Sequence, residues 1–450
     1  MGKKHLLLAF CAFTCCAYSY AESPKSMQIW LKDGQQKSFY VSDVDSVTFG
    51  IAEEQPYQEL NEWTMPPVIE HPAPLKLSGN ELEYVKAENQ LAKSYFKKIC
   101  EAKQDSNRFF CPISLNMALG LCANGASDKG AKEIANALGF KDGDELAEMN
   151  QYFNKLYLSL NAQQDSCIFS LNNAIWPLKG LTVLEPFLTS AREQYYATVR
   201  HLDFLNDPVG SKAIIDQWAD TMTHGLISKL SFEPDNAITL VINNACYFKA
   251  QWMKEFDSLL TQTDTFTTFN GEKRLVKMMK NDTWKYAEND SSQIVELPYK
   301  GPYSMFLVLP KENVSVEGAI ETLDETLLTQ TTYPSNEGYA LSLPKFDITD
   351  AMTLKQISND LGINDMFQQF NRAISMKSYV SEIIQDSHIK LDEQGTEAAA
   401  VTSVIVVGGG TLGPKNIIKF NRPFGYVIVE KNSGMMLFMG KCTKLGEDIE

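Results

Sequence analysis

The first half of the chain carries apolar residues at the three- and four-residue spacing of amphipathic helices. Such stripes predict helices over Tyr84–Cys100, Pro112–Ala123, Ser127–Leu138 and Glu145–Leu160. Later segments are short, apolar and rich in β-branched and aromatic residues, which predicts strands. These strands are predicted at Cys167–Trp176, Thr198–Phe204, Ile238–Phe248, Arg274–Met279, Gln293–Leu297, Ser304–Leu309, Tyr339–Thr349, Ile417–Phe420, Gly425–Glu430 and Met435–Gly440. A helix is predicted among them at Ala213–Met222. Helices first and strands later predict an α+β fold with large mixed or antiparallel sheets.

The run Gly395–Gly413 departs from this pattern, because after Glu397 it carries no charge before Lys415. Its first part, around Ala398–Ala400, is compatible with a helix or a strand, whereas Val404–Val407 favours a strand. Three consecutive glycines then make the chain flexible. An uncharged, β-prone run left in water is an aggregation hazard. The run is therefore either a permanent strand of a sheet or an exposed segment that can become buried elsewhere in the protein.

The first 21 residues have the pattern of a secretory signal peptide. Lys3 and Lys4 precede the apolar run Leu6–Ala17, and small residues lead to a cleavage point near Ala21. The apolar run is too short to span a bilayer. We expect a secreted, extracellular or periplasmic protein, and Cys11, Cys15 and Cys16 leave surface attachment through a lipid open.

Residues 22–79 are predicted to be a hairpin leader followed by a proline-rich linker. Met27–Gly50 reads as two short strands around an Asp33-Gly34 turn, and it resembles leaders on exported proteins of Bacteroidetes-type bacteria. Ile51–Ser78 carries prolines at 56, 66, 67, 72 and 74, which favours an extended spacer. The main domain is expected at residues 80–450.

Composition narrows the function. The 450 residues carry a net charge of −15, which argues against nucleic acid or a heparin-like polyanion as a main partner. The five histidines show no catalytic or metal-binding spacing, no phosphate loop or nucleophile elbow is present, and no cofactor or metal is expected. The sequence therefore argues weakly against an enzyme. The six cysteines after the leader are scattered, which favours buried free thiols, with one or two disulfides left open.

Twelve ordered blocks between Asn80 and Leu445 resemble the serpin superfamily. One block, Asn-Ala-Cys-Tyr-Phe-Lys-Ala-Gln-Trp at Asn244–Trp252, is close to the family's Asn-Ala-Ile-Tyr-Phe-Lys-Gly-x-Trp. The others are Phe109–Leu115, Gly125-Ala126, Leu171–Trp176, Leu202–Phe204, Ile215–Trp218, Thr223–Ile227, Val276–Met279, Glu296–Tyr299, Leu343–Phe346, Phe420–Phe424 and Leu437–Lys441. The resemblance implies helices packed on three mixed or antiparallel sheets, with an exposed reactive-centre loop.

The resemblance also implies an inhibitory-type bacterial serpin, a monomer that forms a covalent complex with its target serine protease. The protease attacks the exposed loop, and the cleaved loop 395–407 inserts into the central sheet before the acyl-enzyme is hydrolysed. A non-inhibitory carrier with the same fold, or an inhibitor of papain-like cysteine proteases, remains an alternative.

The residues that match the family's inhibitory hinge are Gly395, Thr396, Glu397, Ala398, Ala399, Ala400 and Val401. In a strand, every second residue points to the same face. The residues that share a face with Thr396 carry no charge, and those nearest to Thr396 are small, so this face can be buried against a core. Counts from the two ends of the loop disagree on the reactive bond and leave Gly409, Gly410, Thr411, Leu412 and Gly413 as candidates. No Arg or Lys lies between Lys390 and Lys415, so elastase-, subtilisin- or chymotrypsin-like targets are expected rather than trypsin-like ones.

The region that lets the family's main sheet open matches Cys111, Ser114, Asn244, Trp252 and Gln385. Two positions depart from the family pattern, which usually has Ser at Cys111 and His at Gln385. A glutamine can still bridge by hydrogen bonds, whereas a thiol does so only weakly. We expect these departures to affect the energetics of sheet opening more than the fold.

Overall fold

The structure is a computed structural model that describes residues 26–30, 36–40, 58–61, 75–141, 145–164, 167–234, 238–282, 285–329, 331, 339–396 and 416–448. The chain divides into two compact units, Met1–Pro56 and Tyr57–Glu450. The first contains an antiparallel hairpin of β1 (Ser26–Trp30) and β2 (Gln36–Tyr40). Within the described ranges, no helix is both long enough and apolar enough to cross a membrane.

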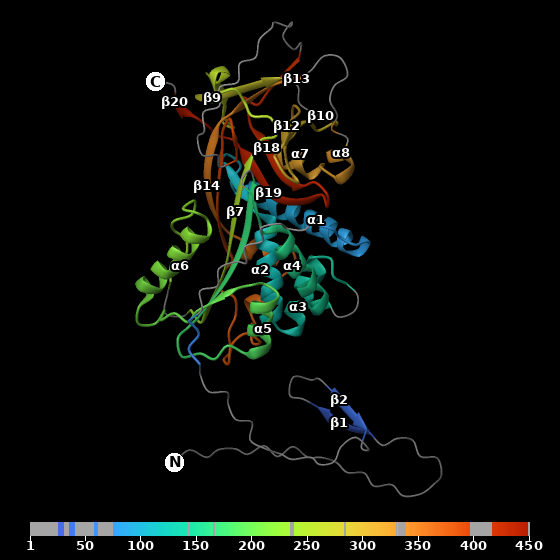
Figure 1. Ribbon diagram of the computed structural model, residues 1–450, viewed down its shortest axis with the longest axis vertical. Helices are drawn as coiled ribbons and strands as arrows, with labels where there is room; N and C mark the ends of the chain where they lie inside the picture. Colours follow the sequence, from blue (N-terminus) through green and yellow to red (C-terminus); the bar gives the residue numbers. More distant parts are fainter. Residues whose placement is uncertain are drawn as a thin grey trace, which may run out of the picture. The chain divides into compact units, whose positions relative to one another are not determined.

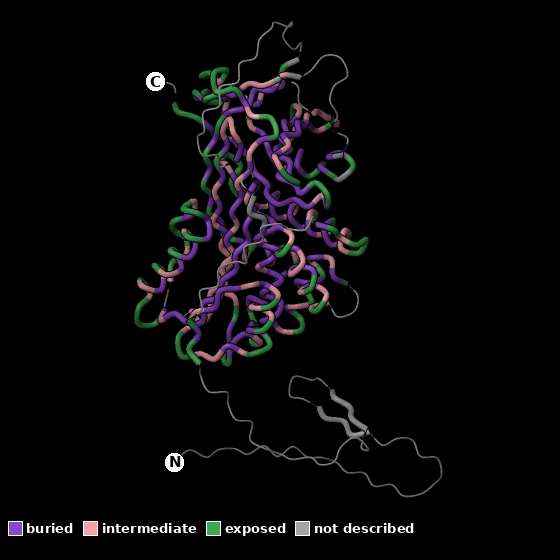
Figure 2. The backbone as a smooth tube through the Cα atoms, viewed as in Figure 1, coloured by how far each residue is buried: buried purple, intermediate pink, exposed green. Residues whose placement is uncertain are grey.

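The helices of the second unit begin with α1 (Gly79–Ala102), which is capped by Ser78 in a capping box with Glu81. The others are α2 (Pro112–Gly125), α3 (Asp128–Ala137), α4 (Glu145–Leu160), α5 (Glu185–Glu193), α6 (Pro208–Met222), α7 (Val316–Glu321), α8 (Glu325–Thr329), α9 (Lys355–Asp360) and the 3₁₀ turns η2 (Ser258–Leu260) and η3 (Asp365–Phe367). The apolar α2 is buried on nearly all sides, and its residues appear in purple near the centre of Figure 2.

Sheet A, the largest sheet, has the strand order β14-β15-β16-β7-β5-β4, with β6 beside β5. Its strands are β14 (Phe346–Thr353), β15 (Ile384–Leu391), β16 (Gly395–Thr396), β7 (Leu240–Gln251), β5 (Cys167–Pro177), β4 (Ala162–Gln164) and β6 (Thr198–Val199). In β14 buried and exposed residues alternate strictly, which is the period of a strand with one face in water.

Two further sheets complete the unit (Figure 1). The six-stranded sheet has the order β10 (Lys285–Glu288), β11 (Ser292–Pro298), β12 (Tyr303–Pro310), β18 (Phe424–Glu430), β19 (Met435–Cys442) and β3 (Arg108–Phe110). The third contains β17 (Asn416–Lys419), β13 (Tyr339–Pro344), β9 (Lys273–Asp282), β20 (Glu447–Asp448) and β8 (Gln262–Thr267). Strands β12, β18 and β19 of the six-stranded sheet are buried along their whole length, so the six-stranded sheet is covered on both faces. The expected α+β architecture with mixed and antiparallel sheets is confirmed.

Two predicted strands differ from the observed ones. The run Tyr339–Thr349 forms two strands, β13 and β14, which belong to different sheets and are separated at Lys345. The run Thr198–Phe204 forms a strand only at β6, because the backbone N–H of Arg200 donates to Ile175 but that of His201 donates to Leu60.

Part of the predicted linker belongs to the second unit and packs on its other residues. Leu60 is buried, its N–H donates to His201 Nδ1 at 2.8 Å, and Asn61 bridges to Arg200. All six described cysteines are free thiols. Burial raises the pKa of Cys100, Cys122 and Cys167 to about 12, which keeps these thiols protonated and unreactive.

Candidate functional site

The start of the predicted hinge lies inside sheet A. Gly395 and Thr396 form β16, in which Thr396 pairs with Leu391 of β15 on one side and with Ala250 of β7 on the other. The remaining predicted hinge and reactive-bond residues lie outside the described part of the chain: Glu397, Ala398, Ala399, Ala400, Val401, Gly409, Gly410, Thr411, Leu412 and Gly413.

Gly395 lies where a side chain has no room. A Cβ atom at this position would lie 2.0 Å from the carbonyl oxygen of Ala250. The preceding turn is tight, because the N–H of Asp392 donates to the carbonyl of Gly395 at 3.0 Å and the N–H of Gln394 donates to Asp392 Oδ1 at 2.9 Å. The close approach of β7 therefore requires glycine at this point.

Thr396 faces the core. Its side chain is buried, and its Oγ1 lies 2.6 Å from the hydroxyl oxygen of Tyr299. Burial raises the pKa of Tyr299 well above its usual range, so the phenol keeps its proton. Tyr299 also stacks on Trp252 with ring centroids 4.3 Å apart. The alternation deduced from the sequence thus begins with Thr396 pointing inward.

Trp252 holds the turn from the side of β7. Its Nε1 donates to the carbonyl of Asp392 at 3.0 Å, and its backbone N–H donates to the carbonyl of Gln394 at 2.8 Å. The side chain is fully buried. Trp252 therefore contacts the turn that precedes the predicted hinge, besides serving as a core residue.

A charged contact holds the outer side of the same turn. Lys345 Nζ lies 2.7 Å from Glu393 Oε2, and Thr261 Oγ1 donates to Glu393 Oε1 at 2.8 Å. Partial burial acts to raise the pKa of Glu393, but the hydrogen bonds from Lys345 and Thr261 outweigh it and leave the pKa lowered. The carboxylate therefore stays ionised at neutral pH and anchors the turn before Gly395 to Lys345, which directly precedes β14.

Beyond Thr396, β7 and β15 separate. Among the described residues no hydrogen-bonded ladder joins these two strands directly, and only the two residues of β16 lie between them. We call the space that continues from Thr396 toward Leu240 the slot. A small cavity in the slot is lined by Thr396 and by inward-facing residues of both strands. These are Cys246, Phe248, Ser387 and Ile389, with Ile428 and Phe438 of the six-stranded sheet behind them.

A larger cavity, of about 110 Å³, continues the slot toward the start of β7. Ser114, Asn244 and Gln385 line it together with apolar side chains such as Leu119 and Ile242. The Oδ1 atom of Asn244 is buried and has no hydrogen-bond partner among the described residues, whereas its Nδ2 donates to Asn173 Oδ1 at 2.7 Å. A buried carbonyl oxygen without a donor is costly, so this end of the slot presents an acceptor to any strand that fills it.

Gln385 ties β15 to the start of α2. Its Nε2 donates to the backbone carbonyl of Cys111 at 3.0 Å, and its Oε1 accepts from the backbone N–H of Cys111 at 2.8 Å. The thiol of Cys111 takes no part in this bridge. Burial raises the pKa of Cys246 well above its usual range, and a contact with the Cys111 thiol adds to the effect. Four of the five predicted sheet-opening residues therefore line the slot, and Trp252 lies at its closed end.

Sequence reasoning missed two groups at this site. Tyr299 belongs to one of the sequence blocks, but its contact with Thr396 is not among the predictions, although a threonine hydroxyl at an inward-facing position implies a buried partner. The contact between Glu393 and Lys345 joins residues far apart in the chain. No spacing in the sequence brings these two residues together.

Comparisons with known proteins agree with this geometry. The family model described as Serpin (serine protease inhibitor) matches residues 86–445. A serpin-like protein of Methanosarcina acetivorans is 31% identical over 75% of this chain and 81% of its own length. The plasma serine protease inhibitor of Bos taurus is 30% identical (78% and 88% covered), and the leukocyte elastase inhibitor of Homo sapiens is 28% identical (79% and 97% covered).

Solved structures share the fold at lower identity. Native tengpin, a thermophilic serpin, superposes with a TM-score of 0.73 and 24% identity, covering 84% of this chain and 98% of tengpin. Human thyroxine-binding globulin, solved in complex with thyroxine, superposes with a TM-score of 0.74 and 24% identity, covering 82% of this chain and all of the globulin.

Proposed function

The chain belongs to the serpin family, and from that premise we propose that it is an irreversible suicide inhibitor of serine proteases. The observation that carries the proposal is β16, where Gly395 and Thr396 already pair with both β15 and β7. A chain that enters the sheet at this point needs only to continue along the slot to become a complete central strand.

The register of β16 sets the path of insertion. Continued two residues at a time, it places Ala398 between Phe248 and Ile389, and Ala400 between Cys246 and Ser387. These partners line the small cavity of the slot. Methyl side chains fit such a narrow space, whereas a larger or charged side chain would not.

The same register places Thr402 between Asn244 and Gln385. The Asn244 Oδ1 atom has no donor among the described residues, and a threonine hydroxyl supplies one. The order of small, small and hydroxyl side chains in the loop therefore matches the order of apolar and polar positions along the slot. This match supports insertion over a permanently exposed loop.

In the proposed reaction the protease serine Oγ attacks the carbonyl carbon of a bond within Gly409–Gly413. The peptide C–N bond breaks, the released amine takes a proton, and an ester joins the protease to the inhibitor. Insertion then carries the protease along the sheet before water hydrolyses the ester. Run 395–407 would span about 43 Å at ~3.3 Å per residue.

We propose an elastase-, subtilisin- or chymotrypsin-like target. The loop between Lys390 and Lys415 offers no cation for the acidic pocket of a trypsin-like protease. Val407, Thr411 and Leu412 suit pockets for small or apolar side chains. The human relative named for leukocyte elastase agrees with such a class.

A carrier function is the competing proposal, since thyroxine-binding globulin has the same fold. The test is incubation with an elastase and with subtilisin, followed by a denaturing gel. We expect a covalent complex that survives SDS, and the mass of the released C-terminal peptide then locates the reactive bond. Cleavage without a complex across a panel of proteases would exclude the inhibitory function, and a protease with a blocked active-site serine is the control.

We further propose that the protein acts after export as a monomer. The signal-like residues 1–21 support export, and the net charge of −15 disfavours recruitment by heparin-like polyanions. N-terminal sequencing of the mature protein, expected to begin just after Ala21, tests the first point. Sedimentation at several concentrations tests the second.

A further inference from the structure

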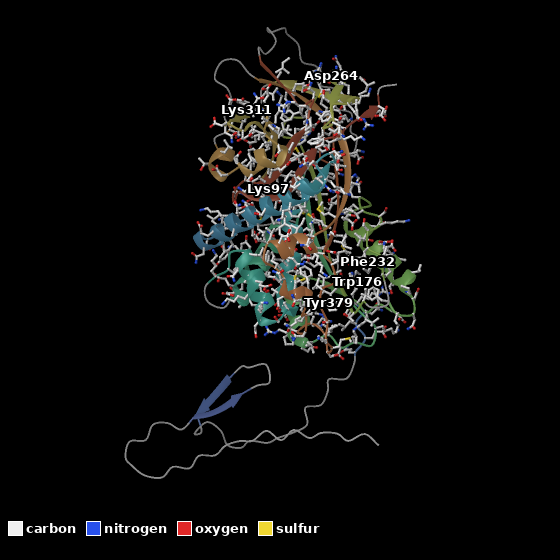
Figure 3. All side chains as sticks on the ribbon, turned by 180° about the vertical axis from the view of Figure 1, so that it is seen from behind. Lys97, Trp176, Phe232, Asp264, Lys311 and Tyr379 are labelled. Carbon is white, nitrogen blue, oxygen red and sulfur yellow. The ribbon has the colours of Figure 1, made fainter. Side chains whose placement is uncertain are left out.

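Cys111 and Cys246 approach each other beneath sheet A. Cys246 lies on β7 and packs against the main core, whereas its neighbour Ala245 belongs to a smaller apolar cluster on the side of α6. Figure 3 labels Trp176 of that cluster. Adjacent residues of a strand point to opposite faces, so Cys246 points away from α6 and toward α2, which packs under β7. Cys111 directly precedes α2, and both cysteines line the small cavity of the slot.

The two thiols are in contact. Burial raises the pKa of Cys246 well above its usual range, and the Cys111 side chain, as a hydrogen-bonding neighbour, raises it further. At the other four described cysteines the raised pKa comes from burial and, at Cys100, also from charged side chains, with no contribution from a second thiol. These four are Cys100, Cys122, Cys167 and Cys442. Two free thiols in contact can join with little movement of the backbone.

Neither cysteine follows the family pattern. Cys111 stands where the pattern has serine, and Cys246 stands where the block Asn-Ala-Ile-Tyr-Phe-Lys has isoleucine. A serine and an isoleucine cannot be cross-linked. The pair is therefore a feature of this chain and not of the pattern that it otherwise resembles.

We propose that Cys111 and Cys246 are a site of disulfide formation that joins the start of α2 to β7. The structure describes the reduced form, in which both thiols are free. The oxidant is itself a disulfide, either oxidised glutathione or the active disulfide of an oxidoreductase.

The reaction is a thiol–disulfide exchange in two steps. One cysteine thiolate attacks the oxidant and forms a mixed disulfide, and the thiolate of the other cysteine then displaces the remaining sulfur of the oxidant. The S–S bond between the two cysteines replaces the S–S bond of the oxidant. The oxidant leaves as two thiols that take up the two protons, so it gains the two electrons that the cysteines lose.

The bond is expected to form while the chain folds or while the slot is open. Thiolates are the attacking species, and the buried Cys246 thiol keeps its proton at neutral pH. The cavity beside the two cysteines measures only about 20 Å³, which is room for one water molecule but not for an oxidant of the size of glutathione. The closed, reduced protein should therefore resist oxidation.

The disulfide would tie both walls of the slot to one residue. Gln385 of β15 already holds the backbone N–H and carbonyl of Cys111 through its amide. Once β7 is joined to the side chain of Cys111, separation of β7 from β15 has to break this bridge. This consequence rests on the proposed inhibitory insertion, whereas formation of the bond does not. We expect the reduced protein to be the better inhibitor.

The first test needs no protease target. The chain is produced in the oxidising periplasm of a bacterial host behind a signal peptide of that host, and in parallel in a reducing cytosol. Free thiols are blocked, and the peptides of a digest are identified by mass. We expect the periplasmic protein to give linked peptides that contain Cys111 and Cys246 and that separate on reduction. Links between other cysteines, or blocked thiols at both positions, would overturn the proposal.

The second test compares oxidised and reduced protein against one protease, for which wild type is divided between complex and cleaved product. The reductant is removed before mixing, so the protease is unaffected. The ratio of complex to cleaved inhibitor should be about fivefold lower for oxidised wild type, because slower insertion leaves more time for deacylation. Cys111→Ser and Cys246→Ser should give the same ratio after both treatments. Cys167→Ser removes a buried thiol outside the pair, so it should respond as wild type does.

The outcomes separate the disulfide from the inhibitory function. A mapped link with equal ratios in oxidised and reduced wild type would show that the bond does not restrain insertion, and this part of the proposal would be wrong. If wild type forms no complex in either state, the inhibitory function fails, and the peptide map alone decides whether Cys111 and Cys246 are joined.

Discussion

At position 385 a glutamine stands where the family pattern has a histidine, and its side chain bridges to the backbone through its amide group. The family pattern has histidine at this position, but the glutamine amide both donates to and accepts from the backbone of Cys111. The bridge satisfies two buried backbone groups at the start of α2. It also explains why the second departure, Cys111, is tolerated, since the thiol does not contribute to the bridge.

Replacing Gln385 with leucine should destabilise the uncleaved protein, with its thiols reduced, by about 2–4 kcal/mol, because two buried backbone groups lose their partner while the site keeps a side chain of similar size. The midpoint of denaturant-induced unfolding measures this loss. Cys111→Ser is the matched control and should leave the midpoint almost unchanged, because both hydrogen bonds go to backbone atoms. Equal losses in the two variants would show that the bridge is not what stabilises this region.

Glu88 carries a pH dependence that can be assigned to one residue. It is buried on α1, Tyr152 donates to its Oε2 at 3.0 Å, and its Oε1 has no partner among the described residues. Burial raises its pKa to about 8, against 4.5 in an unfolded chain. At low pH both states hold the proton. Between these values only the unfolded state releases it, so stability falls as pH rises toward about 8.

Glu88→Gln should therefore be more stable than wild type above pH 8, by roughly 2–4 kcal/mol, and should match it near pH 4. The measurement is the denaturation midpoint across this pH range. Glu83→Gln, on the same helix but exposed in a surface pair with Lys86, is the control and should leave the profile of wild type unchanged. A wild-type profile without a fall between pH 5 and 8 would show that Glu88 is not held neutral.

At the scale of elements, the alternation of the loop predicts opposite outcomes for neighbouring residues. Ala398→Arg places a charge at a position that faces the core once inserted, between Phe248 and Ile389, and burial of an unpaired guanidinium is prohibitive. We expect the yield of covalent complex to fall at least about tenfold, with the loop cleaved as a substrate.

The matched variant is Ala399→Arg, which introduces the same charge on the outward-facing alternate. It should keep most of the complex on the same denaturing gel, because the guanidinium stays at the surface of the sheet. Equal loss in both variants would mean that the loop does not insert in the register of β16. Retained complex in both would mean that it does not insert at all.

Elements with strong periodicity could be predicted from the sequence. The stripe Glu145–Leu160 coincides with α4, and Pro112 begins α2 as predicted. The short helices α7, α8 and α9 were missed, because five or six residues do not establish a helical period. Apolar runs also give no information on which sheet a strand joins, so β13 and β14 were predicted as one strand.

The sequence predicts only those parts of the candidate site whose residues lie close together in the chain. The predicted hinge is marked by a run of small residues, and of its residues the structure describes Gly395 and Thr396, with Thr396 facing inward as the alternation requires. The contacts of β15 with Cys111, and those of Asp386 and His388 with the segment that joins α6 to β7, join residues brought together only by the fold. No spacing in the sequence encodes such contacts.

At the scale of the whole molecule, the proposed insertion requires that the uncleaved chain has not reached its most stable arrangement, and among the described residues no strand beyond Thr396 lies between β7 and β15. Cleavage of the loop frees residues 397–407 to continue β16, which would add about ten or more backbone hydrogen bonds at roughly 0.5–1.5 kcal/mol each. We expect the thermal midpoint to rise by at least about 10 °C after cleavage within Gly409–Gly413. Scanning calorimetry of intact and cleaved protein measures the shift.

Cleaved Ala398→Arg is the control, since a chain that cannot insert should keep the midpoint of the intact protein. A wild-type midpoint that does not move would favour the alternative in which run 396–407 is already a permanent strand or never enters the sheet. If cleavage raises the thermal midpoint of wild type but not that of Ala398→Arg, the added stability comes from insertion of the loop into the slot. The drive for trapping a protease would then come from the same unpaired strands that leave Asn244 Oδ1 without a donor among the described residues.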